Sequence, residues 1–122
     1  MSDTRRKRIL DAVNHKQPDR VPLDFGGTTC TGIHCSLVAE LREYYGLEKR
    51  LVKAFDTFQM LGWIDQDLMD AMELDAALVM PYSTAFGNTL EDWKEWRSPW
   101  GQEVLIPQSM EITVIQVHGF CF

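Results

Sequence analysis

The sequence predicts an α/β fold with parallel strands, and three observations lead to that prediction. Helical patterns alternate with two short apolar segments, residues 21–25 and 75–80, which is the order expected of β/α units. Both segments end in turn-forming residues, Gly26-Gly27 and Pro81. Two parallel strands do not form a stable sheet by themselves, because such a sheet is covered on both faces. We therefore expect the chain to form the beginning of a larger α/β architecture.

The first predicted element is a helix that ends at about Asn14. Ser2, Asp3 and Thr4 are all residue types that cap a helix N-terminus, and Pro18 follows the helix because proline cannot continue it. Its apolar side chains are expected to form a narrow buried stripe, made up of Ile9, Leu10, Ala12 and Val13. The first predicted strand comes directly after this break.

A second helix is predicted over residues 36–45. Ser36 can cap it, and Gly46 supplies the left-handed residue that ends it. Residues 51–55 are compatible with either a strand or a helix, as short apolar runs usually are. Residues 65–72 are predicted to be helical and lead into the second predicted strand.

The pattern changes after the second predicted strand. Residues 82–101 are predicted to be loop-like, with tryptophans interleaved with charged residues and a turn signal at 98–101. Residues 103–106 and 112–117 are predicted to pair as an antiparallel β-hairpin. Two hypotheses remain open for the aromatic side chains, a satellite core, which we favour, and a face that lines a cofactor. The side chains concerned are Trp93, Trp96 and Trp100.

The composition is that of an ordinary globular domain. The 122 residues are 45% hydrophobic and 25% charged, with a net charge of −6, which excludes disordered and collagen-like chains. No apolar run approaches the roughly 20 residues of a membrane span, and no apolar stretch follows the basic N-terminus as in a secretory signal. The three cysteines lack CxxC spacing, so neither a disulfide framework nor a zinc ribbon is indicated. We therefore expect a protein of the reducing cytoplasm with no membrane partner.

The charge is unevenly distributed along the chain. Residues 1–20 hold six basic and three acidic side chains, a balance of +3, whereas residues 21–122 hold six basic and fifteen acidic side chains, a balance of −9. Nucleic-acid-binding domains usually have a basic surface, so no nucleic-acid partner is expected. The basic residues 5–8 are expected to form a solvated helix end, and the alternative is contact with an anionic substrate or phosphate.

One local cluster of metal-capable side chains occurs, at Cys30, His34 and Cys35. A structural zinc site needs four ligands, and the other histidines and the third cysteine lie far away in sequence. The side chains of two adjacent residues also point in different directions on a helix or a strand. We therefore expect these residues to be ordinary loop and helix-start residues and the chain to hold no metal.

The end of the first predicted strand is the best candidate for a binding site. Gly26-Gly27 could let the backbone approach a ligand closely, although two glycines also commonly end a strand. Asp24 lies within the apolar segment, and a carboxylate there needs a partner if it is buried. A solvated position for Asp24 at the strand end is the favoured alternative.

Residues 5–27 carry a recognisable pattern. They include His-Lys-x-Pro-Asp-Arg-Val-Pro at residues 15–22, which joins the first helix to the first predicted strand. Further matching segments lie at residues 32–34, 41–47, 55–59, 64–75 and 98–101. On these residues the chain closely resembles the N-terminal part of the uroporphyrinogen decarboxylase family, and in particular the branch that includes corrinoid-dependent methyltransferases.

The resemblance implies a (β/α)₈ TIM barrel, of which this chain holds only the N-terminal portion, because a whole barrel typically needs ~250 residues. Residues 1–114 would be a partial barrel domain with an inserted β-hairpin. Residues 115–122 depart from the family pattern and are expected to be a divergent tail produced by a frameshift or truncation.

The resemblance also implies where substrate binds. Barrel enzymes bind substrate at the mouth formed by the C-terminal ends of the strands. Asp24, Phe25, Gly26 and Gly27 occupy that position after the first predicted strand, and Tyr82 does so after the next. These five residues are the predicted substrate-binding residues.

The implied reaction of the parent protein is transfer of a methyl group between a corrinoid and a thiol acceptor, with a small molecule or a corrinoid protein as substrate. Zinc and a corrinoid would be its cofactors, but the family's His-x-Cys zinc site lies in the later half of the barrel. The catalytic residues are therefore expected outside this chain, and the isolated chain is expected to bind neither cofactor and to be inactive.

Two alternatives remain open. The first is a uroporphyrinogen decarboxylase, a carboxy-lyase of tetrapyrrole (porphyrin) biosynthesis. That branch resembles this chain less, because it carries arginines after the first strand and residues 24–28 contain none. The second is a non-catalytic interaction module that docks a partner through residues 93–100 and its unpaired strand edges. For an isolated fragment, the exposed strand edges and apolar faces predict self-association.

Overall fold

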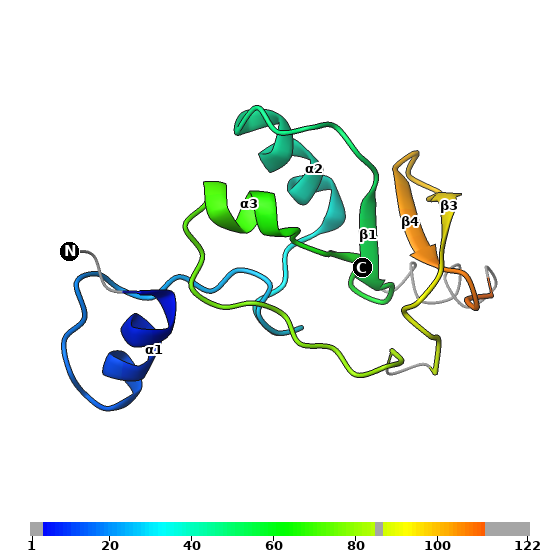
Figure 1. Ribbon diagram of the computed structural model, residues 1–122. Coiled ribbons are helices and arrows are strands. Elements are labelled where there is room, and N and C mark those ends of the chain that lie inside the picture. The colour runs from blue at the N-terminus through cyan, green and yellow to red at the C-terminus, as the bar shows by residue number, and fades with distance from the viewer. Residues whose placement is uncertain (1–3, 85–86, 112–122) are drawn as a thin grey trace.

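The computed structural model describes residues 4–84 and 87–111 and confirms the mixed α/β class (Figure 1). The described strands form one open sheet in the order β2-β1-β4-β3. β1 and β4 are parallel, with Val52 opposite Val104, and the other two pairs of neighbours are antiparallel. The elements are α1 (Arg5–Val13), α2 (Cys35–Tyr44), β1 (Val52–Asp56), β2 (Leu61–Gly62), α3 (Gln66–Ala71), β3 (Trp93–Arg97) and β4 (Glu103–Pro107).

Helix α1 has the predicted bounds but the opposite orientation. The Thr4 hydroxyl accepts a hydrogen bond from the Lys7 N–H (3.2 Å) and caps the helix. The predicted buried stripe is wrong, because Leu10 is 46% and Val13 is 68% exposed. The buried residue of α1 is Arg8, which is 4% exposed. Its ion pairs hold the charged face of the helix inward, so the apolar face points outward.

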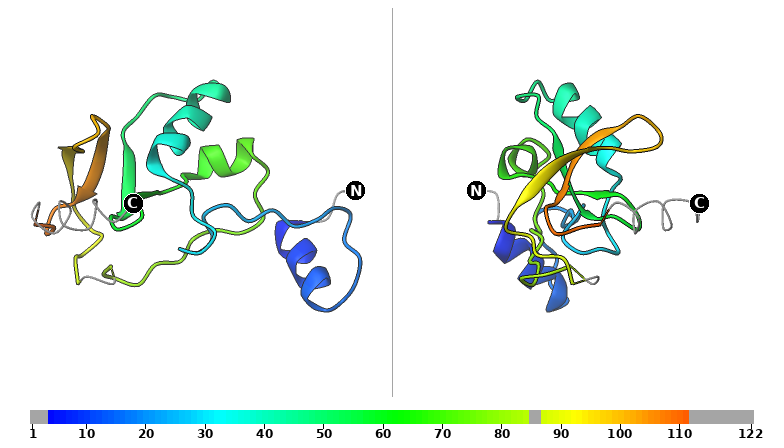
Figure 2. Two further views of the ribbon diagram at one scale, coloured as in Figure 1. Left: turned by 180° about the vertical axis from the view of Figure 1, so that it is seen from behind. Right: turned by 90° about the vertical axis from the view of Figure 1, so that its right-hand side faces the viewer.

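The two predicted parallel strands, residues 21–25 and 75–80, are not strands in the structure. They lie side by side and run in the same direction (Figures 1 and 2). The Asp75 N–H donates to the Leu23 carbonyl oxygen (2.8 Å), and the Leu23 N–H donates to the Asp75 carboxylate (2.9 Å). The Asp75 side chain thus accepts the hydrogen bond from Leu23 that a backbone carbonyl of a neighbouring strand would otherwise accept. The prediction of a second buried strand is also wrong at Val79, which is 89% exposed.

The N-cap of helix α2 lies two residues earlier than predicted. His34, rather than Ser36, is its N-cap, because the His34 side chain accepts a hydrogen bond from the Ser36 N–H (3.2 Å). The predicted end is confirmed at Gly46, which has a φ of 66°. That left-handed conformation is the one in which glycine carries no steric penalty.

The ambiguous segment 51–55 is resolved as a strand, β1. Helix α3 confirms the prediction for residues 65–72, with Asp65 as its N-cap. Between them, the short strand β2 is held beside the start of α2, because the Cys35 N–H donates to the Met60 carbonyl oxygen (2.8 Å). This contact ties α2 to one edge of the sheet.

The hairpin in the structure differs from the predicted one. The predicted strand at 103–106 is confirmed as β4, but its hairpin partner is β3, which lies in a segment predicted to be a loop. The turn predicted at 98–101 joins them, and the Gly101 N–H donates to the Ser98 carbonyl oxygen (2.9 Å). Residues 112–117, the predicted second strand, lie outside the described residues.

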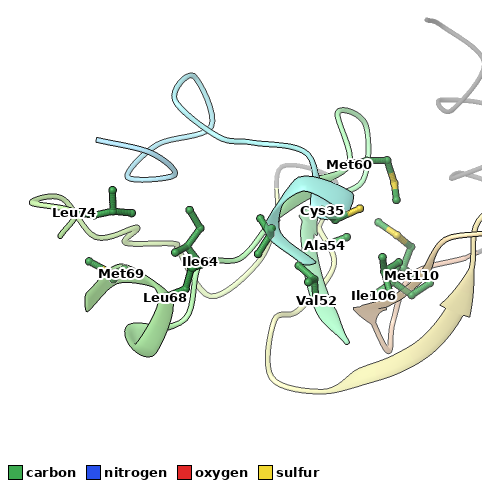
Figure 3. Packing of buried hydrophobic residues seen from close by; sticks show 12 residues of the cluster. Cys35, Val52, Ala54, Met60, Ile64, Leu68, Met69, Leu74, Ile106 and Met110 are labelled. Atoms are coloured by element: carbon green, nitrogen blue, oxygen red, sulfur yellow. The ribbon is translucent and has the colours of Figure 1, made fainter. Parts of the chain in front are cut away.

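The core lies where α2 and α3 pack beside the sheet (Figure 3). Successive residues of β1 point to opposite faces of the sheet, as the two-residue period of a strand requires. The buried residues of the core are Cys35, Val38, Val52, Ala54, Met60, Ile64, Leu68, Met69, Leu74, Val104, Ile106 and Met110.

The tryptophans of the 93–100 segment do not form one satellite core. Trp96 packs against the main core, whereas Trp93 lies under the ammonium of Lys53 (5.2 Å to the ring centroid). Trp100 is 56% exposed at the tip of the hairpin. Trp93 and Trp96 have different surroundings because they are an odd number of residues apart on β3 and so point to opposite faces of the sheet, whereas Trp100 lies in the turn after β3.

Gly62 allows α2 to approach the sheet closely, and Gly62→Ala is expected to lower the free energy of unfolding by about 2 kcal/mol. A Cβ at Gly62 would lie 2.7 Å from Val38 Cγ2 and 2.9 Å from the Cys35 Cα atom. Urea denaturation measures the change. Because part of the clash is with Val38, Val38→Ala should lower the free energy of unfolding by less in the Gly62→Ala variant than in the native chain. Strict additivity of the two changes would contradict this contact.

Candidate functional site

The predicted binding loop at residues 24–27 is a turn closed by its own hydrogen bonds. Asp24 is exposed, and its Oδ1 atom accepts hydrogen bonds from the Gly27 N–H (2.8 Å) and the Thr31 hydroxyl (3.2 Å). The Gly26 N–H donates to the Thr31 carbonyl oxygen (2.8 Å). The favoured hypothesis for Asp24, a solvated strand end, agrees with this exposure.

Both glycines of this loop are needed for its shape. Gly26 has a φ of 84°, and a Cβ on Gly27 would lie 2.5 Å from Asp24 Oδ1. The backbone N–H groups of both are engaged within the loop, so they do not form a cradle for an anion. The groups that remain to meet a ligand here are the second carboxylate oxygen of Asp24 and the ring of Phe25, which is 43% exposed.

Tyr82, the fifth predicted residue, lies at a separate place. Its side chain is 66% exposed, and its hydroxyl donates to Glu91 Oε2 (3.1 Å). The hydrogen bond to Glu91 raises the pKa of Tyr82 above its ordinary value, because it favours the protonated phenol. Within residues 4–84 and 87–111, no hydrogen bond joins Tyr82 to the 24–27 loop. The described contacts therefore do not assemble the five predicted residues into one pocket.

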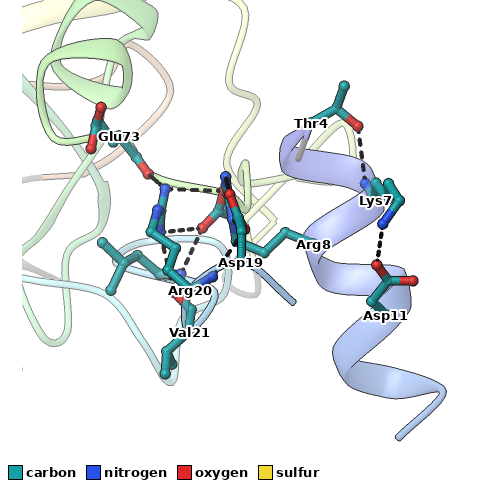
Figure 4. Close-up of polar contacts among 10 residues, drawn as sticks. Thr4, Lys7, Arg8, Asp11, Asp19, Arg20, Val21 and Glu73 are labelled. Carbon is teal, nitrogen blue, oxygen red and sulfur yellow. Dashed lines mark hydrogen bonds and ion pairs between the residues drawn. The ribbon is translucent and has the colours of Figure 1, made fainter. Parts of the chain in front are cut away.

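A buried charge cluster, Arg8 with Asp19, Arg20 and Asp75, joins three distant parts of the chain (Figure 4). The Asp75 side chain has no exposed surface, and it pairs with Arg8 Nη1 and with Arg20 Nη1 (2.9 Å). Asp19 binds the same guanidinium through Arg8 Nε (2.6 Å) and Nη2 (3.0 Å). The expectation that residues 5–8 form a solvated helix end is therefore wrong for Arg8.

The electrostatics of this cluster favour the ionised form of Asp75. Burial alone would raise the pKa of Asp75, but the hydrogen bond from the Leu23 N–H and the charges of Arg8 and Arg20 outweigh burial and hold the pKa below 3.8, its ordinary value. Sequence reasoning missed the cluster because Arg8 and Asp75 are 67 positions apart. The one available signal was a carboxylate at the start of an apolar segment, which needs a partner when it is buried.

A second charge cluster lies between α2 and the start of α3. Arg42 is 2% exposed and binds both carboxylate oxygens of Asp67, at 2.9 and 2.8 Å. Arg50 pairs with the same Asp67 and with Asp65 Oδ2 (3.4 Å). The hydrogen bonds from Arg42 hold the pKa of Asp67 well below its usual range. These acidic residues at the start of α3 anchor it to α2.

The lowered carboxylate pKa values predict that the fold is destabilised in acid. Asp67 and Asp75 have folded-state pKa values below 3.8, so protons bind more tightly to the unfolded chain. Their contribution to stability is complete above the unfolded-state pKa and is lost as pH falls through the folded-state values. The urea concentration at the midpoint of unfolding should stay constant between pH 7 and about pH 5 and should decrease steadily below about pH 5. Asp67→Asn should show a shallower decline, and a midpoint that is unchanged down to pH 3 would contradict the prediction.

Two of the three metal-capable residues lie at the start of α2: His34 is its N-cap, accepting the Ser36 N–H at Nδ1, and Cys35 is its first residue. Cys30 is exposed and Cys35 is buried, and burial raises the pKa of the Cys35 thiol, which disfavours the nucleophilic thiolate. No group of three or more His, Cys, Asp or Glu residues suited to a metal ion occurs in the described part of the chain.

Two open cavities flank the sheet, and the predicted substrate-binding residues line neither. The larger, of about 700 Å³, lies between α2, residues 46–52 and the start of β4. The smaller, of about 460 Å³, lies between His34, residues 58–61 and the hairpin tip at Trp100. Sequence reasoning did not identify these cavities because each is formed by segments that are far apart in the chain.

Two further findings bear on the identity of the protein. Over the described residues, no helix is both long enough and apolar enough to cross a membrane. Comparison of the chain with protein-family models, with curated proteins and with solved structures finds no match.

Proposed function

We propose that the chain forms the N-terminal part of a barrel of the uroporphyrinogen decarboxylase family, and that its parent transfers a methyl group between a corrinoid and a thiol acceptor. The motif at residues 15–22 supports the family assignment. The observation that carries the proposal is the parallel course of residues 21–25 and 75–80, which lie side by side with one backbone hydrogen bond between them. Neighbouring strands of a β/α barrel are arranged in this way.

Within this proposal, the 24–27 loop and Tyr82 lie at the barrel mouth, where strands end and substrate binds. The closed turn at Asp24 would give that rim a fixed shape, and Phe25 would present an apolar face to substrate. Zinc and the corrinoid would be held by residues other than those described. The absence of arginine from residues 24–28 favours methyl transfer over decarboxylation of a polycarboxylate porphyrinogen. The cysteine usage supports a location in the reducing cytoplasm.

The proposal is tested by supplying the purified chain with methylcobalamin and a thiol and following the absorbance of the corrinoid. We expect no methyl transfer, because the chain would form only the first part of the barrel. Methyl transfer by this chain would contradict the proposal that it forms only the first part of the barrel.

The family assignment is tested by the DNA that follows codon 122. A reading frame, in any register, that encodes further β/α units with a His-x-Cys pair would support the methyltransferase assignment. If such a frame lacked that pair and the expressed protein released CO₂ from uroporphyrinogen, the decarboxylase alternative would replace it. A region that encodes no further β/α units would overturn the barrel proposal.

A further inference from the structure

Helix α1 presents an apolar surface away from the rest of the chain. Arg6, Leu10 and Val13 follow the i, i+4, i+7 spacing and so share one face of the helix. All three side chains are exposed, whereas Arg8, on the opposite side, is buried against Asp19 and Asp75. The ion pairs therefore fix α1 in the one orientation that leaves its apolar face open and flanked by positive charge.

The larger cavity has the complementary character. It is a groove of about 700 Å³ whose lining includes the apolar side chains of Leu47, Leu51 and Val104. Three carboxylates also line it, Glu40, Glu43 and Glu103. None of these three forms an ion pair within residues 4–84 and 87–111.

The basic side chains of the groove do not cancel this acidic character. Arg42 and Arg50 also line it, but both are engaged by Asp67. Lys49 is the remaining basic side chain in the lining. The groove therefore favours an apolar helix face that carries positive charge, a combination that α1 presents.

The face and the groove lie at opposite ends of the molecule. Figure 1 and the left view of Figure 2 place α1 at one end of the molecule, away from α2 and the β3–β4 hairpin. The groove lies between α2, residues 46–52 and the start of β4. The α1 of a chain therefore does not reach the groove of the same chain. The two surfaces can meet only between copies.

We propose that α1 of one copy docks, through Leu10, Val13 and Arg6, into the acidic groove of a second copy of this chain. An amphipathic helix that lays its apolar face into a groove is a common mode of recognition. The +3 balance of residues 1–20 and the −9 balance of residues 21–122 favour it electrostatically. The contact joins different surfaces of the two copies, so it gives either a reciprocal pair or a longer array. It does not rest on the proposed function.

The proposal is tested by sedimentation of the full chain over a range of concentrations. We expect the mean mass to rise above 14.1 kDa with concentration, and the dissociation constant to increase with added salt. Leu10→Asp should raise the dissociation constant about tenfold or more, because it places a charge in the apolar contact. Circular dichroism and the urea midpoint check that the variant is folded.

Charge reversal distinguishes this contact from nonspecific association. Arg6→Glu and the double variant Glu40→Lys/Glu43→Lys should each associate weakly alone, and mixing the two should restore association. Glu95→Lys makes one Glu-to-Lys change on an exposed residue of β3, outside the groove lining, and should associate like the native chain. Failure of the mixture to restore association would overturn the proposal.

Other occupants of the α1 face give different results. A chain that stays at 14.1 kDa up to about 100 µM would overturn the proposal. Association that Val79→Asp abolishes and Leu10→Asp does not would assign the contact to the exposed 75–80 segment instead. If the monomeric chain binds vesicles of anionic phospholipid, and Leu10→Asp prevents that binding, then the α1 face is a membrane-binding surface.

Discussion

Asp75→Asn is expected to lower the free energy of unfolding by about 3 kcal/mol, because it removes one partner of a buried ion pair. The Asp75 side chain is fully buried and faces Arg8 and Arg20. Asparagine keeps the shape and can still accept the hydrogen bond from the Leu23 N–H, so the change removes chiefly the charge. Arg8 would keep its pairing with Asp19, but the Arg20 guanidinium would lose the carboxylate that it pairs with, which leaves an uncompensated positive charge. Urea denaturation at pH 7 measures the loss.

Asp70→Asn is the matched control for Asp75→Asn. Asp70 also pairs with an arginine of the N-terminal segment, Arg5 (2.7 Å), but the Asp70 side chain is 57% exposed. Solvent screens such a pair, and exposed pairs contribute little to stability. We expect the urea midpoint of Asp70→Asn to stay close to that of the native chain. A loss of stability in Asp75→Asn as small as that in Asp70→Asn would contradict the buried pairing of Asp75 with Arg8.

Phe55→Ala is expected to lower the free energy of unfolding by about 4 kcal/mol, because it leaves a large cavity beside β1. Phe55 is 1% exposed and meets the ring of Trp63 edge to face, with the ring centroids 5.9 Å apart. Both the apolar burial and this ring contact are lost in the variant. Urea denaturation gives the energy, and near-ultraviolet circular dichroism reports the changed surroundings of Trp63.

Phe55→Leu is the control for the cavity. Leucine fills part of the space that alanine leaves open, so its loss should be much smaller, about 1 kcal/mol. If Phe55→Ala and Phe55→Leu have the same urea midpoint, then Phe55 does not fill a packed site in the protein.

The helix boundaries were predictable because their signals are local. The Thr4 hydroxyl and the left-handed Gly46 act within a few residues of the helix that they cap or end. The N-cap of α2 was predicted two residues late because Ser36 is the commoner N-cap type, whereas the structure uses the ring of His34. The turn at residues 98–101 was predicted for the same local reason, but the strand that precedes it, β3, was not predicted.

The candidate site was less predictable because its residues take their roles from distant partners. The sequence indicated a turn at Gly26-Gly27, but it placed Asp24 in a strand, and the structure shows that the Asp24 carboxylate helps to close that turn. No local pattern indicates that Arg8 pairs with Asp75, or that α2 and the start of β4 line one groove.

By itself, the sequence determined the α/β class, the positions of the three described helices and the glycine-rich turn at residues 24–27, because caps, glycines and apolar spacing act over a few residues. Tertiary structure alone decided which face of α1 is buried, that residues 21–25 and 75–80 remain outside the sheet, and that β1 pairs with β4. The physical reason is the buried carboxylate of Asp75. It draws Arg8 inward and takes the Leu23 N–H, and both effects depend on a residue more than 50 positions away from its partner.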